Sequence, residues 1–69
     1  MKLNYPKVHI DHDKVFVSFY INQKRYRLYN GKRIGSNTNP NSHPQEERVT
    51  IGNVLAAEVY KHVTSGGIL

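Results

Sequence analysis

One stretch, Val15–Tyr29, constrains the fold of this 69-residue chain more than any other. Its first half is rich in β-branched and aromatic residues, which suit a pleated sheet, and its second half alternates basic residues with Tyr and Leu. Asn22-Gln23 interrupts the run, and asparagine tolerates the left-handed backbone that a two-residue hairpin loop needs. The stretch therefore predicts a β-hairpin.

A two-residue loop at Asn22-Gln23 decides which side chains share a face of this hairpin, because side chains alternate along a strand. A three-residue loop would slip the second strand and bury Arg25 and Arg27, and burying unpaired guanidinium groups costs several kcal/mol. We therefore expect one apolar face and one basic, aromatic face. The apolar set is Val15, Val17, Phe19, Ile21, Tyr26 and Leu28, and the other set is Phe16, Ser18, Tyr20, Arg25, Arg27 and Tyr29.

The segments that flank the hairpin predict one more strand and a loop. Residues 7–10 alternate polar and apolar side chains, which predicts a first strand whose Val8 and Ile10 join the apolar face. Residues 32–35 are expected to form a ragged strand end. Residues 36–42 are rich in turn formers and contain no periodic apolar positions, so we expect a loop there.

After this loop the spacing of the apolar residues changes from that of a strand to that of a helix. Ile51, Leu55, Val59 and Val63 recur every four residues, which predicts a helix from about Pro44 to Thr64 with one apolar stripe on the sheet. Ser42 and Gln45 have the spacing of a capping box, and Gly66-Gly67 suits a C-terminal cap. The predicted fold class is α+β: one domain over residues 1–69, with a three-stranded antiparallel sheet packed against one C-terminal α-helix.

Charge is distributed unevenly along the chain. Residues 1–35 hold eight Lys or Arg against two Asp, whereas residues 36–69 hold two basic residues against three Glu. Positive charge concentrated on the sheet half is typical of a domain that meets a polyanion, and nucleic acid fits better than a membrane because no basic amphipathic helix is present. The chain has no cysteine and no apolar run of membrane-spanning length, which favours a cytoplasmic setting.

The sequence does not favour a metal site, a nucleophilic catalytic site or a phosphate-binding loop. His9 and His12 are three residues apart, so a strand would turn them to opposite faces, and no cysteine completes a tetrahedral site. Ser18, His9 and Asp11 lack a nucleophile elbow and an oxyanion turn. The predicted protein is not an enzyme and takes no cofactor, metal or small-molecule substrate.

The basic face of the hairpin has a physical use. Arg25 and Arg27 would project side by side about 7 Å apart, as alternate strand residues do, with Ser18 and Tyr20 opposite. The major groove of DNA admits a two-stranded ribbon, and arginine binds the two acceptors of guanine with a bidentate fork. A solvated face whose aromatic rings cover the arginine stems is the alternative interpretation.

Two segments resemble the amino-terminal arm-type DNA-binding domain of tyrosine recombinases, the integrases of phages and conjugative elements. They are Val15–Arg27, which contains Asn-Gln-Lys-Arg-Tyr-Arg, and the helix end Leu55–Gly67, which contains Leu-Ala-Ala-Glu-Val. The resemblance covers about residues 8–69. It departs from the family pattern in having Gln23 where glycine is usual, and in its long Asn/Pro/Ser loop.

The resemblance implies a sheet inserted in the major groove at arm-type sites, within a longer bacterial or phage-encoded integrase whose core-binding and catalytic domains follow this one. None of the five tyrosines would be the recombinase nucleophile, which belongs to the later domain. The remaining alternatives are a free-standing regulator or RNA or single-strand binder, and a structural or toxin-like small protein. The DNA-binding residues expected from both arguments are Ser18, Tyr20, Lys24, Arg25, Arg27, Tyr29, Lys32 and Arg33.

Overall fold

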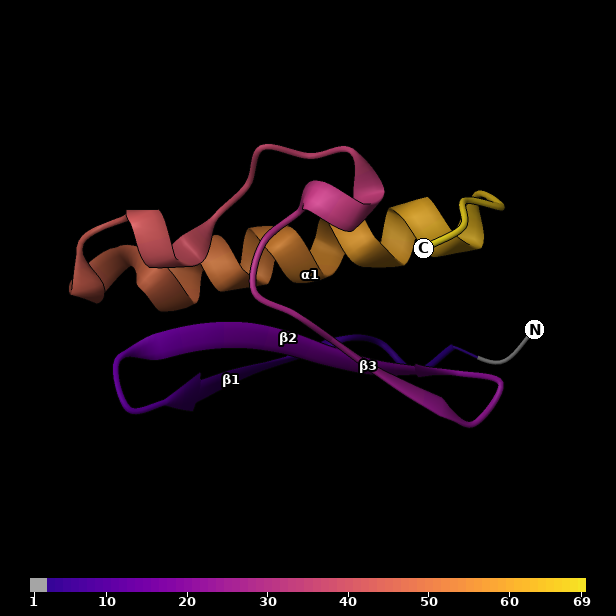
Figure 1. Ribbon diagram of the computed structural model, residues 1–69, viewed down its shortest axis with the longest axis horizontal. Coiled ribbons are helices and arrows are strands. Elements are labelled where there is room, and N and C mark those ends of the chain that lie inside the picture. The colour runs from indigo at the N-terminus through magenta and orange to yellow at the C-terminus, as the bar shows by residue number, and fades with distance from the viewer. Residues whose placement is uncertain (1–2) are drawn as a thin grey trace.

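The computed structural model describes residues 3–69, and it has one long helix on one face of a three-stranded antiparallel sheet (Figure 1). Strands β1 (Lys7–Asp11), β2 (Lys14–Ile21) and β3 (Lys24–Leu28) lie in the order β1-β2-β3, and helix α1 covers Arg48–Thr64. The predicted α+β class and element order are confirmed. Lys2, counted above among the basic residues, lies outside the described residues.

The hairpin has the register that its side-chain pattern predicts. Residues 17–21 of β2 pair with residues 28–24 of β3, and Asn22-Gln23 forms the loop between them. The φ angles of Asn22 and Gln23 are 51° and 75°. Positive φ at both central positions is the pattern of a type I′ turn, whose twist matches that of paired strands. The division of the hairpin into two chemically different faces follows from this register.

The core lies between the sheet and α1. Gly52 lets the two layers approach closely, because a β-carbon built there would lie 2.8 Å from Val15 Cγ1 and 3.0 Å from Val8 Cγ1. The fully buried side chains come from alternate positions of the hairpin and from one stripe of the helix, as the two periodicities require. They include Val15, Val17, Phe19, Leu55, Val59 and Val63.

Ile10 does not join the core, contrary to expectation. It pairs with Val15 and so lies on the helix side of the sheet, yet 62% of its surface is exposed. Val8, two residues earlier, is half-buried and packs against the core. The difference follows from the position of α1: Val8 lies beside Gly52, where a β-carbon would be 3.0 Å from Val8 Cγ1, whereas Ile10 lies further along the strand, one pair before the turn to β2.

Helix α1 starts later than expected. A 3-10 turn over Gln45–Glu47 precedes it, and the predicted capping box does not form. The Ser42 hydroxyl donates to Asn39 O at 2.8 Å, and the Gln45 amide donates to Asp13 Oδ1 at 3.1 Å, so both side chains are used elsewhere. The C-terminal cap is confirmed: Gly66 N–H donates to Val63 O and Gly67 N–H donates to His62 O, which is a Schellman motif.

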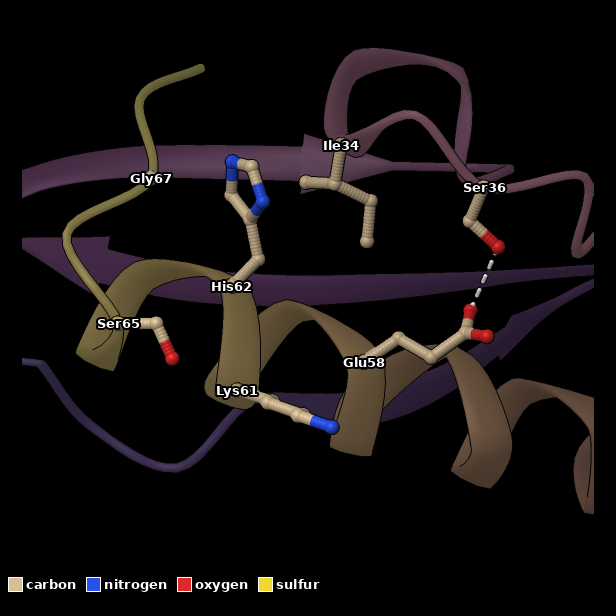
Figure 2. A pocket seen from close by; sticks show the side chains of 7 residues that line it. All are labelled: Ile34, Ser36, Glu58, Lys61, His62, Ser65 and Gly67. Carbon is tan, nitrogen blue, oxygen red and sulfur yellow. Dashed lines mark hydrogen bonds between the residues drawn. The ribbon is translucent and has the colours of Figure 1, made fainter.

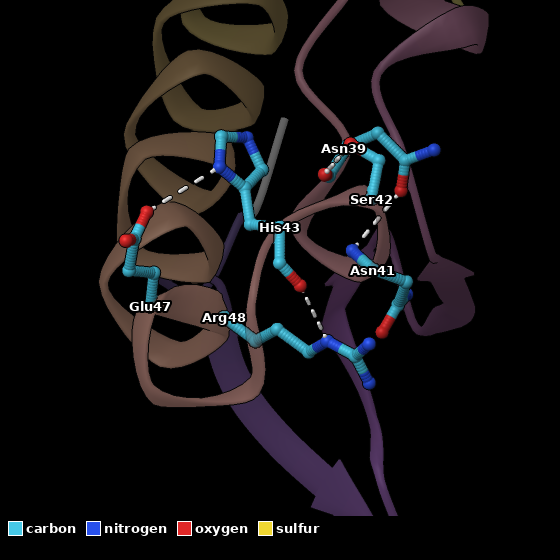
Figure 3. A network of polar contacts seen from close by, with 6 residues as sticks. All are labelled: Asn39, Asn41, Ser42, His43, Glu47 and Arg48. Carbon is cyan, nitrogen blue, oxygen red and sulfur yellow. Dashed lines mark hydrogen bonds and ion pairs between the residues drawn. The ribbon is translucent and has the colours of Figure 1, made fainter.

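The connection between β3 and α1 is a series of short turns, not a strand end and a bare loop. Lys32–Ile34 and Pro40–Ser42 are 3-10 helices. Pro40 is fully buried, so the connection does have an apolar anchor that the absence of periodicity concealed. Arg48 closes the segment by donating from Nε to His43 O at 2.9 Å (Figure 3).

Asn41 ties this connection to the sheet. Its Oδ1 accepts from Val15 N–H at 2.8 Å and its Nδ2 donates to Val15 O at 2.9 Å. Strand β3 is too short to reach Val15, since its last pair joins Leu28 to Val17. The Asn41 amide therefore takes the place of one further residue of β3, and satisfies a donor and an acceptor that would otherwise be unpaired.

Candidate nucleic-acid interface

The face of the sheet opposite α1 is the candidate interface, and we call it the open face. In Figure 1 the helix and the connecting turns all lie on the other side of the sheet. The strand pairing places nine side chains on the open face: Lys7, His9, Asp11, Lys14, Phe16, Ser18, Tyr20, Arg25 and Arg27. Four of them are basic and one is acidic, so the face is positively charged.

Phe16 is the centre of the open face. The His9 ring stacks on it with 4.9 Å between ring centroids, and Tyr29 lies against it with 5.3 Å between centroids. The guanidinium carbon of Arg27 lies 4.8 Å from the Phe16 centroid, a cation–π distance. These neighbours cover Phe16 so well that only 7% of it is exposed, although it is on the uncovered side of the sheet. Arg27 is therefore held in place by an aromatic support.

Ser18 lies where the sequence predicted, but its hydroxyl is already engaged. Ser18 Oγ is 2.6 Å from His9 Nε2, across the β1–β2 pair. Only 8% of Ser18 is exposed, so its contribution to this face is to hold His9. His9 in turn covers one side of Phe16.

Arg25 and Tyr20 form the more accessible part of the open face. They pair across β2 and β3, both are exposed, and 44% of Tyr20 is accessible. The ion pairs among residues 3–69 join His12 to Asp11 and His43 to Glu47, so neither Arg25 nor Arg27 is neutralised by a described acid. Both guanidinium groups thus keep their charge for an external anion.

The structure separates three of the expected residues from this set. Lys24 shares a face of β3 with Tyr26, and its Nζ lies 5.4 Å from the centroid of the Tyr26 ring. Arg33 Cζ lies 5.9 Å from the same centroid. Tyr26 packs on core residue Phe19, so Lys24 and Arg33 belong to the helix side of the hairpin. Lys32 is exposed in the turn after β3, where its N–H donates to Asn30 Oδ1. Lys24 and Arg33 thus lie on the opposite side of the sheet from Tyr20, Arg25 and Arg27.

Sequence reasoning placed Phe16 and His9 near the basic face but gave neither a role there. Alternation along the strands was the signal that could have found them, since Phe16 precedes Ser18 by two residues and His9 pairs with Phe16. What alternation could not show is that the Arg27 guanidinium lies over the Phe16 ring.

One of the hollows on the described surface, of about 490 Å³, lies beside the C-terminal half of α1 (Figure 2). Its polar lining does not form a hydrolytic site, because Ser36 Oγ donates directly to Glu58 Oε1 at 2.9 Å with no histidine between them. His62 Nε2 is instead 2.9 Å from Ile68 O. The described residues also bring together no group of three or more potential metal ligands, and none of their helices is long and apolar enough to cross a membrane.

A scan against family models and searches of curated proteins and solved structures each returned no similar protein. The resemblance to recombinase arm domains therefore stays a prediction that rests on the residues quoted above.

Proposed function

We propose that this chain is a sequence-specific, double-stranded DNA-binding domain that uses the open face of its sheet. The observation that carries the proposal is a face with no covering element among the described residues, on which Arg25 and Arg27 project from one strand without an acidic partner. Lys7 and Lys14 add positive charge on the same face.

The geometry suits the major groove. A β-ribbon fits its width, and arginine can donate two hydrogen bonds to guanine O6 and N7. Arg27 starts with its guanidinium held over Phe16, so less side-chain entropy is lost when it binds. Arg25 and the Tyr20 hydroxyl are accessible to base edges or phosphates. Lys24 and Arg33 lie on the helix side of the sheet and Lys32 lies in the turn after β3, so none of the three is assigned a base contact.

Duplex DNA is favoured over single strands or RNA by the state of Phe16. Binding of single strands relies on aromatic rings on which bases can stack. Both His9 and Arg27 already contact the Phe16 ring, and only 7% of Phe16 is exposed. A-form RNA has a deep, narrow major groove that a sheet cannot enter. The ring at the centre of the open face is therefore not free to stack on a base, and the exposed rings, Tyr20 and Tyr29, lie to either side of it beside the arginines.

Following the family resemblance, we propose that the biological role is recognition of arm-type sites during DNA integration by a cytoplasmic tyrosine recombinase. The partners would be double-stranded DNA and the core-binding and catalytic domains of the same protein. Coding sequence beyond Leu69 tests this part: it should encode a helical domain and then an Arg, His-x-x-Arg and Tyr set. A free-standing module would lack that set, and DNA binding itself would be unaffected by this outcome.

Titration by fluorescence anisotropy tests the binding proposal. Labelled random-sequence duplexes, the same sequences as single strands, and duplexes enriched from a random pool by repeated selection would be compared at two salt concentrations. We expect duplex binding that weakens with salt, and tighter binding to the selected duplexes. Equal affinity for single strands and duplexes, or failure of the selection to enrich any sequence, would count against the proposal.

A further inference from the structure

No strand of residues 3–69 pairs with the outer edge of β1. β1 is an edge strand, and alternate residues of an edge strand direct their backbone N–H and C=O groups away from the sheet. No described backbone or side-chain group outside the sheet bonds to the backbone of residues 7–11. Such an edge can accept another strand, so the question is which strand its side chains fit.

The sequence of β1, Lys-Val-His-Ile-Asp, is complementary to itself in the antiparallel direction. If two copies pair about a two-fold axis through His9, Lys7 of each faces Asp11 of the other, and Val8 faces Ile10. The Lys7–Asp11 pairs join opposite charges on the open face, and the Val8–Ile10 pairs join apolar side chains on the other face, which are favourable combinations. His9 faces its own copy at the axis, where each ring is held by Ser18 and Phe16 of its own chain. Lys7 and Asp11 are both exposed in the single chain and can meet such a partner.

The other edge of the sheet lacks this property. β3 reads Lys-Arg-Tyr-Arg-Leu, so self-pairing about Tyr26 would set Arg25 opposite Arg27 of the second copy. Like charges directly opposite one another destabilise a strand pair. Only the β1 edge is therefore suited to pairing with its own copy.

An exposed apolar side chain, that of Ile10, lies on the β1 edge, and other exposed apolar or aromatic side chains lie on α1 and just before β1. Ile10 is 62% exposed on the helix side of the sheet, and Val49 near the start of α1 is 39% exposed. Tyr5 and Tyr60 stack on each other with 4.9 Å between centroids, and 57% and 39% of them are exposed. Pairing through β1 would cover Ile10 with Val8 of the second copy, which explains an apolar residue that the single chain leaves in water.

From these observations we propose that the β1 edge is an interface for a second copy of this chain, joined as a symmetric, antiparallel β-ladder. A two-fold axis perpendicular to the sheet keeps both helices on one side and both open faces on the other. The result would be one continuous six-stranded surface. The inference does not depend on the proposed DNA binding, since self-association can be measured without DNA.

Sedimentation equilibrium over a rising series of protein concentrations tests this inference. The mass should rise from 8.0 kDa toward twice that value. Lys7→Asp sets two like-charge pairs across the axis and should weaken association about tenfold or more. The double variant Lys7→Asp with Asp11→Lys exchanges the charges and should restore it. Lys61→Asp, the same charge change on the exposed surface of α1, is the matched control and should leave association unchanged.

Circular dichroism of each variant checks that the fold is intact, so that loss of the dimer is not loss of structure. The proposal would be overturned by a wild-type mass that stays at 8.0 kDa at every concentration. Equal weakening by Lys7→Asp and Lys61→Asp would also overturn it, and so would failure of the charge exchange to restore the dimer.

Discussion

At the scale of single residues, two side chains show how local backbone chemistry fixes this fold. Gln23 holds a φ of 75° in the hairpin loop, a conformation that costs most L-residues about 1–2 kcal/mol. Asn41 supplies, from a distant turn, the hydrogen bonds that β3 is too short to make to Val15. The first could be expected from the Asn-Gln loop. The second could not, because nothing in a run of Asn, Ser and Pro tells which amide will reach a strand.

Replacing Gln23 with glycine should stabilise the protein. Glycine adopts positive φ without a steric penalty, although its greater freedom in the unfolded chain offsets part of the gain. We expect Gln23→Gly to raise the free energy of unfolding by roughly 0.5–1 kcal/mol, as measured by urea denaturation. Gln23→Ala keeps the steric conflict and should give no gain. If alanine stabilises as much as glycine, the φ angle is not the cause.

Removing the Asn41 side chain should destabilise the sheet. Asn41→Ala would leave the N–H and C=O of Val15 unpaired, and an unsatisfied buried group costs about 1–3 kcal/mol. The free energy of unfolding should therefore fall by about 2 kcal/mol or more in the same assay. Asn37→Ala, at an exposed position of the same connection, is the control. Equal effects of the two substitutions would mean that the Val15 contact adds nothing.

At the scale of elements, the helix and the hairpin could be predicted wherever their apolar side chains recur at a regular spacing. The hairpin register followed from keeping Arg25 and Arg27 out of the core, and the buried helix stripe followed from a four-residue repeat. The start of α1 was not predictable, because Gln45 bonds across the molecule to Asp13 and not to a capping partner. A prediction from a local motif such as the capping box is wrong where the same side chain forms a hydrogen bond to a residue distant in the sequence.

Leu55 tests the contact between helix and sheet. It is fully buried in the core cluster, so Leu55→Ala should lower the free energy of unfolding by about 2–5 kcal/mol and lower the melting temperature accordingly. Val54→Ala, one residue earlier and 46% exposed, should have a much smaller effect. A melting temperature unchanged by Leu55→Ala would contradict the packing described here.

At the scale of the whole molecule, the fold divides the chain into a covered face and an open face. The apolar stripe of α1 packs on one side of the sheet. The other side carries Arg25 and Arg27, and the Arg27 guanidinium lies over the Phe16 ring. The sequence predicted which residues face outward on the hairpin, because alternation determines it. Alternation also places Lys24, the first residue of β3, on the helix side with Tyr26, although the site prediction grouped it with the open face. The position of Arg33 over Tyr26 was not predictable, since Arg33 lies in a turn after the strand and outside the strand repeat.

The most direct test of the account compares Arg25→Ala with Lys61→Ala in DNA binding. Both remove one exposed positive charge, but Arg25 lies on the open face and Lys61 lies on the helix. Affinity would be measured at two salt concentrations, on a selected duplex and on random duplexes. We predict that Arg25→Ala costs about 1–3 kcal/mol on the selected duplex and much less on random ones, and that Lys61→Ala changes neither. Equal losses from the two variants on both kinds of duplex would contradict recognition of DNA by the open face.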